Sequence, residues 1–113
     1  LGGDLDMYQR IVTVTFRDEL IKASMTNYLQ PIIQQQGKAY GLISMTSTNI
    51  TNLSILDIYI WPDYETAQAA SNEYGAKIRD ALHKAGAKVE TKEGLVERAW
   101  FNGIDDMKAL SNF

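Results

Sequence analysis

The sequence predicts an α+β domain in which four strands and two helices follow one another as β-α-β-β-α-β. Several short segments alternate apolar and polar residues, as strands do, and two longer segments repeat their apolar residues every three to four positions, as helices do. No repeat or low-complexity linker interrupts this order. With 113 residues, 45% of them hydrophobic and 22% charged, the chain has the size and composition of one globular domain.

A strand and a helix are predicted first. Residues 8–16 are rich in β-branched and aromatic residues and alternate between two faces, which is typical of a strand. From Asp18 the apolar period lengthens to that of an amphipathic helix, and the acidic residues at its start suit the positive end of the helix dipole. Gly37 is the expected stop, and Pro31 is expected to kink the helix because it lacks a backbone donor.

A β-hairpin is predicted next. Residues 39–48 and 53–61 have the composition of strands, and the polar residues 49–52 between them are typical of a turn. These segments are expected to be the second and third strands of one sheet.

The second helix is expected to follow the corner at Trp61 and Pro62. Pro62 ends the third strand, and the Asp63 carboxylate can cap the helix by accepting from the free backbone donors of its first turn. Small side chains on the apolar face would let this helix lie close to the sheet, and Gly86 would end it. The predicted apolar face consists of Ala67, Ala70, Ser71, Tyr74, Ile78, Ala81, Leu82 and Ala85.

A fourth strand is predicted within residues 88–101. Its pattern is clearest in residues 95–101, and Gly94 is expected to form a bulge or kink. A short helix is expected from about Asp105 onward.

This order of elements predicts a ferredoxin-like fold, a four-stranded antiparallel sheet with both helices on one face. The other sheet face then needs a cover, and neither of the two alternating sets of third-strand residues is properly polar. We therefore expect a homodimer in which two copies pair through their sheet faces. One set is Ile55, Asp57, Tyr59 and Trp61, and the other is Ser54, Leu56, Ile58 and Ile60.

The charge and composition disfavour several kinds of partner. A net charge of −3 gives no attraction to nucleic acid or to anionic lipid, and no apolar run is long enough to cross a bilayer. The lack of cysteine and of a signal peptide makes the cytoplasm the expected location. Residues 1–7 are expected to be a disordered or remnant N terminus, which leaves residues 8–113 as the single domain. No phosphate-binding loop or metal-ligand spacing is present, so no cofactor is expected.

The corner after the third strand resembles that of the dimeric α/β-barrel superfamily, in particular its antibiotic-biosynthesis-monooxygenase-like families. The similarity lies in Ile58-Tyr-Ile-Trp61 followed by Pro62-Asp-Tyr-Glu-Thr-Ala-Gln-Ala-Ala70, within the element order from about Tyr8 to Phe101. In these families two sheets pack face to face, and each subunit has a pocket between its sheet and its helices. Members include cofactor-independent oxygenases, haem-degrading enzymes, isomerases and proteins of unassigned role, so the resemblance implies the fold more than the chemistry.

Haem degradation is disfavoured within this resemblance. Trp61 lies where haem-degrading members place a pocket tryptophan, but those members also use a histidine on the second helix and an asparagine in the first strand. The single histidine here, His83, lies off the predicted apolar face, and the first strand has no asparagine.

Two interpretations of Trp61 remain open. In one, it is a core residue that closes the start of the second helix. In the other, it forms the wall of a cleft for a flat aromatic ligand. The aromatic residues that would complete this wall are Tyr59, Tyr64, Tyr74 and Trp100.

Asp57 is a carboxylate midway along an otherwise apolar strand. Once buried, it needs water, a hydrogen-bond donor or a cation, and Arg10 and Arg98 are the natural partners. It is therefore either half of a structural ion pair or a general base whose pKa is raised by burial.

Two functions are consistent with these observations. The first is a cofactor-independent monooxygenase-like activity in which Asp57 helps to deprotonate a phenolic substrate, whose anion then reacts with oxygen. In this case Arg10, Arg98 and the aromatic residues would bind the substrate. The second is a non-catalytic ligand-binding or interaction role, for example that of a regulatory domain of the ACT type.

Overall fold

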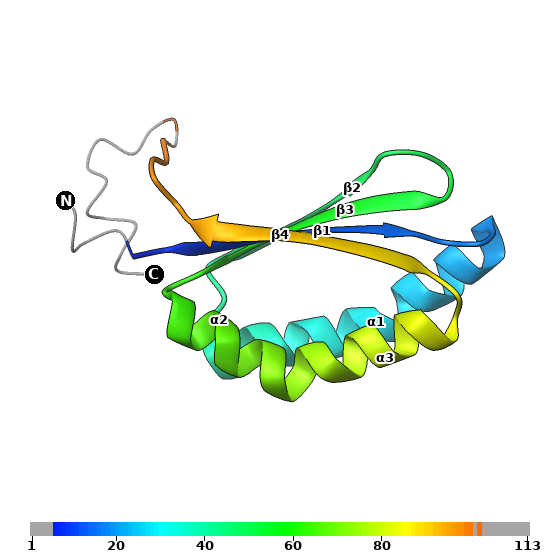
Figure 1. The fold of residues 1–113 in the computed structure, drawn as a ribbon, viewed down its shortest axis with the longest axis horizontal. Helices are drawn as coiled ribbons and strands as arrows, with labels where there is room; N and C mark the ends of the chain where they lie inside the picture. Colours follow the sequence, from blue (N-terminus) through cyan, green and yellow to red (C-terminus); the bar gives the residue numbers. More distant parts are fainter. Residues whose placement is uncertain (1–5, 101, 103–113) are drawn as a thin grey trace.

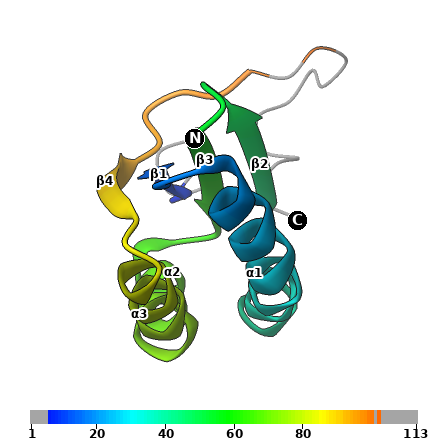
Figure 2. The same ribbon diagram turned by 90° about the vertical axis from the view of Figure 1, so that its right-hand side faces the viewer.

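The computed structural model describes residues 6–100 and residue 102 of the chain. It confirms the predicted ferredoxin-like fold, because four antiparallel strands form one sheet in the order β2-β3-β1-β4 and the helices cover one of its faces (Figures 1 and 2). The elements are β1 (Tyr8–Thr15), α1 (Glu19–Tyr40), β2 (Ser44–Asn49), β3 (Ser54–Trp61), α2 (Tyr64–Ala70), η2 (Ser71–Gly75), α3 (Ala76–Lys84) and β4 (Lys88–Leu95).

The strand register decides which side chains face the helices. In β1 the buried Tyr8 and Val14 face them, and the antiparallel pairing places Trp61 opposite Tyr8 and Asp57 opposite Val12. Because side chains alternate along a strand, Ile55, Asp57, Tyr59 and Trp61 share the helix side of the sheet. Figure 2 shows α1 beneath the β2–β3 side and α2–α3 beneath the β1–β4 side.

The core consists of two clusters between the sheet and the helices. At the end near the start of α2, Trp61 and Tyr59 pack with Ala67 and Ala70. At the other end, Phe16 packs with residues of α1 and α3. The buried members of this second cluster are Val14, Phe16, Leu29 and Leu82.

Helix α1 begins as predicted but ends later than predicted. The Asp18 carboxylate accepts from the Ile21 backbone N–H at 2.8 Å, which caps the helix. The prediction of a stop at Gly37 is wrong, because the helix continues to Tyr40 and ends at Gly41 with a φ of +65°. The second strand is correspondingly shorter at its start than predicted.

The predicted second helix is one helical run with a π-helical turn in its middle. Asp63 caps it as predicted, since its carboxylate accepts from the Thr66 backbone N–H at 2.7 Å. The run passes through α2, η2 and α3 and is followed by Gly86 with a φ of +76°. On the predicted apolar face, Ala67, Ala70 and Leu82 are buried.

The fourth strand lies earlier in the chain than predicted. It covers Lys88–Leu95, whereas residues 96–100 form no strand. The prediction of a bulge or kink at Gly94 is wrong as regards the bulge, because Gly94 pairs with Gln9 in an unbroken register. Met7, placed by the sequence in the N-terminal remnant, is buried, and its carbonyl oxygen accepts from Val96 at 2.8 Å. The helix expected from Asp105 lies outside the described residues.

The outer face of the sheet carries no helix (Figure 1). Its third-strand residues are the set that includes Leu56, Ile58 and Ile60, and Ile11 of β1 lies opposite Ile58. All four apolar side chains remain partly accessible. Among the described helices, none has both the length and the apolar character needed to cross a bilayer.

Candidate functional site

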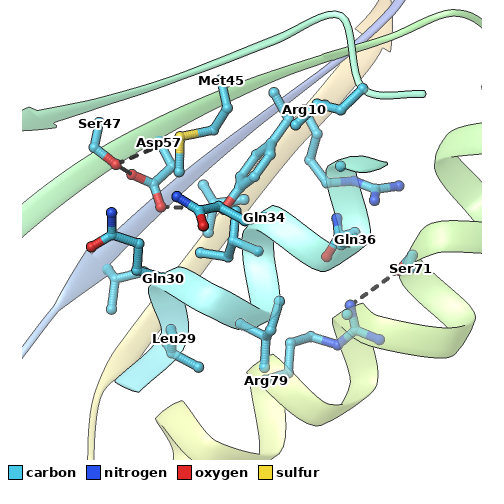
Figure 3. A pocket seen from close by; sticks show the side chains of 18 of the residues that line it. Arg10, Leu29, Gln30, Gln34, Gln36, Met45, Ser47, Asp57, Ser71 and Arg79 are labelled. Atoms are coloured by element: carbon cyan, nitrogen blue, oxygen red, sulfur yellow. Dashed lines mark hydrogen bonds between the residues drawn. The ribbon is translucent and has the colours of Figure 1, made fainter. Parts of the chain in front are cut away.

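A cleft of about 1250 Å³ lies between the sheet and the helices. Apolar side chains from both layers form most of its wall, and a smaller number of polar side chains point into it (Figure 3). Its apolar lining includes Val12, Val14, Leu29, Ile33 and Leu42, and its polar lining includes Arg10, Gln34, Gln36, Ser47, Asp57, Tyr59, Arg79 and Glu93. A cleft of this composition suits a small molecule with a large apolar body and few polar groups.

Asp57 lies in the cleft on the side of the sheet formed by β2 and β3. Ser47, its neighbour on β2, donates a hydrogen bond to the Asp57 Oδ1 atom, and the Tyr59 hydroxyl donates to Oδ2 at 3.3 Å. Burial raises the pKa of Asp57 above its ordinary value, while these two hydrogen bonds act in the opposite direction. Asp57 thus combines the position and the electrostatic environment of a candidate base.

The expected ion pair between Asp57 and an arginine is not formed. Arg10 instead pairs with Glu93, to which it donates through Nη2 at 3.2 Å and through Nε at 3.3 Å. Arg98 is exposed in the segment after β4. The register explains the outcome, because Arg10 lies between Tyr59 and Glu93 in one row across the sheet, while Asp57 lies in the next row.

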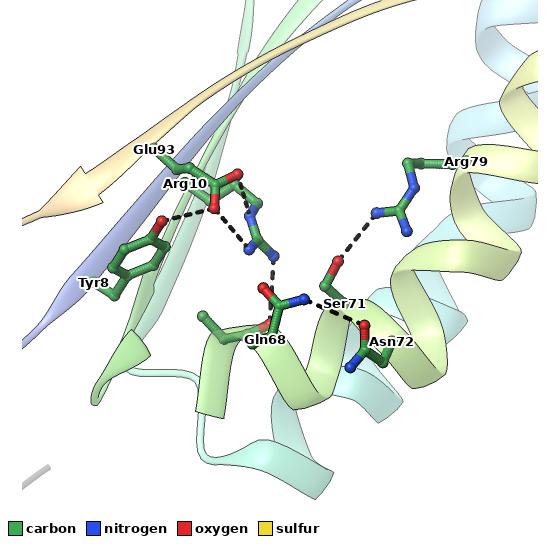
Figure 4. Close-up of polar contacts among 8 residues, drawn as sticks. Tyr8, Arg10, Gln68, Ser71, Asn72, Arg79 and Glu93 are labelled. Carbon is green, nitrogen blue, oxygen red and sulfur yellow. Dashed lines mark hydrogen bonds and ion pairs between the residues drawn. The ribbon is translucent and has the colours of Figure 1, made fainter. Parts of the chain in front are cut away.

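The Arg10–Glu93 pair is extended by Tyr8 and by the first turns of the second helical run (Figure 4). The Tyr8 hydroxyl donates to Glu93 at 2.7 Å, and Arg10 Nη1 donates to the carbonyl oxygen of Ala67 at 3.4 Å. The hydrogen bonds from Arg10 and Tyr8 hold the pKa of Glu93 below its ordinary value. This pair fixes β4 to β1 at the cleft.

Two of the predicted aromatic residues, Tyr59 and Trp61, line the cleft. Trp61 is fully buried, so it is a core residue and a wall of the cleft at the same time. Its Nε1–H has no hydrogen-bond partner in the described part of the chain, and the same is true of Oε1 of the buried Gln36. Burial raises the pKa of Tyr59 above its ordinary value.

The other three predicted aromatic residues lie elsewhere. Tyr74 packs edge-on against Tyr40, with ring centroids 6.2 Å apart, and Tyr64 packs in the same way against Tyr8 at 5.2 Å. Trp100 lies beyond β4 and is 75% exposed. None of them is among the residues that line the cleft.

The sequence reasoning missed several polar residues that line the cleft. The most informative is Gln36, which lies in the run of three glutamines at 34–36 yet is 6% exposed. Its signal was present, because Gln36 lies three and four residues after Ile33 and Ile32 on the apolar stripe of the helix. Ser47 and Arg79 gave no such signal, since their roles depend on neighbours in other parts of the fold. Within residues 6–100, no three acidic or histidine side chains gather as a metal site would require.

Solved structures of other proteins are similar in fold to this chain. The cofactor-independent oxygenase SnoaB from Streptomyces nogalater, in a mutant form, matches with a TM-score of 0.67 and 15% identity over 83% of this chain and 96% of its own. The ActVA-Orf6 monooxygenase of Streptomyces coelicolor, in complex with nanaomycin D, matches with 0.69 and 12% identity over 89% and 96%. A dimeric ferredoxin-like protein from an uncultured marine organism matches with 0.68 and 17% identity over 88% and 96%.

These neighbours match the fold of the superfamily that the sequence resembles. At such low identities, the likeness concerns the fold alone. No protein-family model matches the sequence, and a search of the curated proteins finds no similar one.

Proposed function

We propose that the cleft binds a flat phenolic molecule and that the protein oxygenates it without a cofactor. The observation that carries this proposal is Asp57, a partly buried carboxylate in an apolar cleft, with a raised pKa and hydrogen bonds to neutral partners. An arginine partner would have held its pKa low and neutralised it. Two structural neighbours, an oxygenase described as cofactor-independent and a monooxygenase, support the same chemistry.

In the proposed reaction, Asp57 removes the proton of the phenolic hydroxyl. The resulting phenolate is electron-rich and transfers one electron to dioxygen, and recombination forms a carbon–oxygen bond at the ring carbon para to the hydroxyl. Asp57 returns its proton to the peroxide, and the resulting hydroperoxide loses water, so that one oxygen atom enters the product as a quinone carbonyl and the other leaves as water. The substrate supplies all the electrons, since its C–H and O–H bonds are oxidised as the O–O bond is reduced.

The unpartnered atoms in the cleft support binding of an oxygen-bearing ring. Buried polar atoms normally have hydrogen-bond partners, because an unmade bond in the interior costs about 1–3 kcal/mol. Trp61 Nε1–H and Gln36 Oε1 are such atoms, and they would pair with a ligand oxygen and a ligand hydroxyl once the side chains that cover them move aside. Both residues line the cleft, whose apolar wall would cover the faces of the ring.

The first test is binding and oxygen uptake with 1-naphthol and its three-ring analogue 1-anthrol. We expect both phenols to raise the melting temperature under anaerobic conditions. In air, we expect one molecule of dioxygen to be consumed per molecule of 1,4-quinone formed. Asp57→Asn should retain binding and lose most turnover, whereas Glu90→Gln, on the outer face of β4, should retain both. Turnover unaffected by Asp57→Asn would remove Asp57 from the mechanism.

The same experiment separates this activity from a non-catalytic role. The observation that favours binding alone is the full burial of Trp61, which gives it a sufficient reason to be present as a core residue. Phenols that raise the melting temperature but are recovered unchanged would identify a ligand-binding protein.

We also propose that the outer face of the sheet pairs with that of a second copy. The partly accessible side chains of Ile11, Leu56, Ile58 and Ile60 form an apolar surface that no helix covers. One of the structural neighbours is described as dimeric, which supports this assembly. In such a dimer, each protomer would keep its own cleft on the opposite side of its sheet.

A further inference from the structure

The cleft contains a second polar group, on the side of α3. Arg79 lines the cleft, and its Nη1 atom donates to the Ser71 hydroxyl at 3.1 Å (Figures 3 and 4). Within the described part of the chain, this is the one hydrogen bond that the Arg79 side chain makes, and it forms no ion pair there. A guanidinium group has five N–H donors, so most of those of Arg79 remain free to bind another group.

A glycine lies against the Arg79 guanidinium group. Ser71, Gly75 and Arg79 follow one another at intervals of four residues, and all three line the cleft. A Cβ atom at Gly75 would lie 3.0 Å from Arg79 Nη1 and 3.2 Å from Ser71 Oγ. Glycine weakens a helix interior by about 1 kcal/mol relative to alanine. The missing side chain therefore makes room for the guanidinium group, and it lies in a π-helical turn, a feature that is frequent at functional sites.

The charges around Arg79 favour a single negative charge in the cleft. The ionised side chains that line the cleft are Arg10, Lys38, Arg79, Asp57 and Glu93, which together carry one net positive charge. Glu93 accepts hydrogen bonds from Arg10 and Tyr8, so its charge is already compensated by a closer partner than Arg79. A monoanion such as a carboxylate matches the remaining charge, and it also matches the planar donor geometry of arginine.

The layers of the fold place this group and Asp57 on different sides of the cleft. Arg79 lies on α3, beneath the β1–β4 side of the sheet, whereas Asp57 lies on β3 (Figure 2). Strand β1 separates β3 from β4, and neighbouring strands are about 4.8 Å apart, so the sheet between the two sides is about 10 Å wide. A fused two- or three-ring aromatic system is long enough to span this width.

We propose that Ser71 and Arg79 bind the carboxylate of an aromatic acid whose phenolic hydroxyl, at the far end of the ring system, faces Asp57. This inference rests on the proposed function, because it names the class of substrate for the same cleft. It predicts a hydroxylated polycyclic carboxylic acid rather than a neutral phenol as the preferred ligand.

The test compares three naphthalene compounds by anaerobic titration calorimetry. The probe is 5-hydroxy-2-naphthoic acid, which carries its two groups on different rings and has a hydrogen on the carbon para to the hydroxyl. Its amide removes the negative charge, and 3-hydroxy-2-naphthoic acid places the two groups side by side. We expect the probe to bind about tenfold more tightly than either comparison compound, which corresponds to one charge-assisted contact.

Two substitutions that each remove one positive charge from α3 provide a matched comparison. Arg79→Gln should remove the preference for the acid over its amide. Lys77→Gln removes one positive charge from the same helix, but Lys77 lies over the Tyr74 ring, outside the cleft, so the preference should remain. The preference of the wild-type protein should also decrease with added salt, since charge pairs near a surface are screened.

Gly75→Ala tests the arrangement without removing any charge. The added methyl group should displace the Arg79 guanidinium and lower the preference for the acid, whereas the helix itself should gain stability. An unchanged or raised melting temperature would show that the loss is not due to unfolding. In a protein that already carries Arg79→Gln, adding Gly75→Ala should not change the preference for the acid any further.

The possible results separate this inference from the proposed function. Equal binding of acid and amide, or a preference that survives Arg79→Gln, would overturn the inference. The proposed function would still stand if 1-naphthol binds. Equal binding of the two acid isomers would overturn the placement of the two groups at opposite ends. If neither these compounds nor 1-naphthol bound, both proposals would be overturned.

Discussion

At the level of single residues, Asp57 shows which part of the site can be predicted from the sequence. A carboxylate within an apolar strand is visible in the sequence, and the structure locates it in the cleft. Its partners were not predictable, because they depend on the register between β2 and β3 and on the row that Arg10 occupies. The sequence offered two arginines as partners, whereas the fold provides a serine and a tyrosine.

The raised pKa of Asp57 predicts that Asp57→Asn stabilises the protein at neutral pH. In the unfolded chain Asp57 loses its proton at its ordinary pKa, whereas burial keeps the proton longer in the folded state. Wild-type stability therefore falls as the pH rises from the unfolded to the folded pKa, and the loss persists above it. Asparagine carries no charge and avoids this loss.

Urea unfolding at several pH values would measure this effect. We expect a higher midpoint for Asp57→Asn than for the wild type at pH 7, and equal midpoints below the unfolded pKa of Asp57. A lower midpoint for the variant at pH 7 would mean that a cation stabilises the carboxylate after all.

The two tryptophans provide a second comparison at this scale. Trp61 has no exposed surface, so Trp61→Ala should lower the free energy of unfolding by about 3–5 kcal/mol. Trp100 is 75% exposed, and Trp100→Ala should change the free energy of unfolding by less than about 0.5 kcal/mol. Chemical denaturation of both variants would check this, and similar losses would mean that Trp100 is covered in solution.

At the level of elements, the sequence predicted the type and order of each element better than its ends. β4 was misplaced because Lys88–Leu95 carries four charged residues, as edge strands commonly do, while the more apolar residues 95–101 have a stronger strand composition. The end of α1 was misplaced because two glycines compete for it. Gly37 continues the helix and accepts from the Leu42 N–H at 2.9 Å, whereas Gly41 adopts the left-handed conformation that ends it.

The capping of the second helical run by Asp63 should be measurable. Asp63→Ala should lower the free energy of unfolding by about 1 kcal/mol at neutral pH, because the Thr66 N–H loses its partner. The hydrogen bond to Thr66 lowers the pKa of Asp63, so this contribution is present above the unfolded pKa and is lost as the pH falls through the folded one. Denaturation at pH 7 and in acid should show the difference shrinking, and Asp63→Asn should retain most of the cap.

At the level of the whole molecule, the element order was sufficient to predict the fold, because few arrangements of β-α-β-β-α-β satisfy the rules of strand pairing and handedness. The cleft was less predictable. Its polar lining comes from β1, β2, β3, β4, α1 and the second helical run, so no short segment contains its pattern.

The proposed assembly predicts the effect of a charge on the outer face. Ile58→Lys would place an ammonium group in the apolar surface and oppose pairing with a second copy. Light scattering after size-exclusion chromatography should show a dimer for the wild type and a monomer for the variant. Lys77→Glu reverses a charge on α3, on the other side of the sheet, and should retain the dimer. A monomeric wild-type protein at micromolar concentration would contradict the assembly.

The charges on the edge strand β4 affect how the protein associates at high concentration. The outward-facing side chains of β4 are Lys88, Glu90 and Lys92, next to a row of backbone groups that no further strand covers in the described structure. A strand that added itself at this edge would have to desolvate these charges, which discourages open-ended growth. The charges of β4 therefore leave the apolar face, rather than this edge, as the favoured place for the proposed pairing with a second copy.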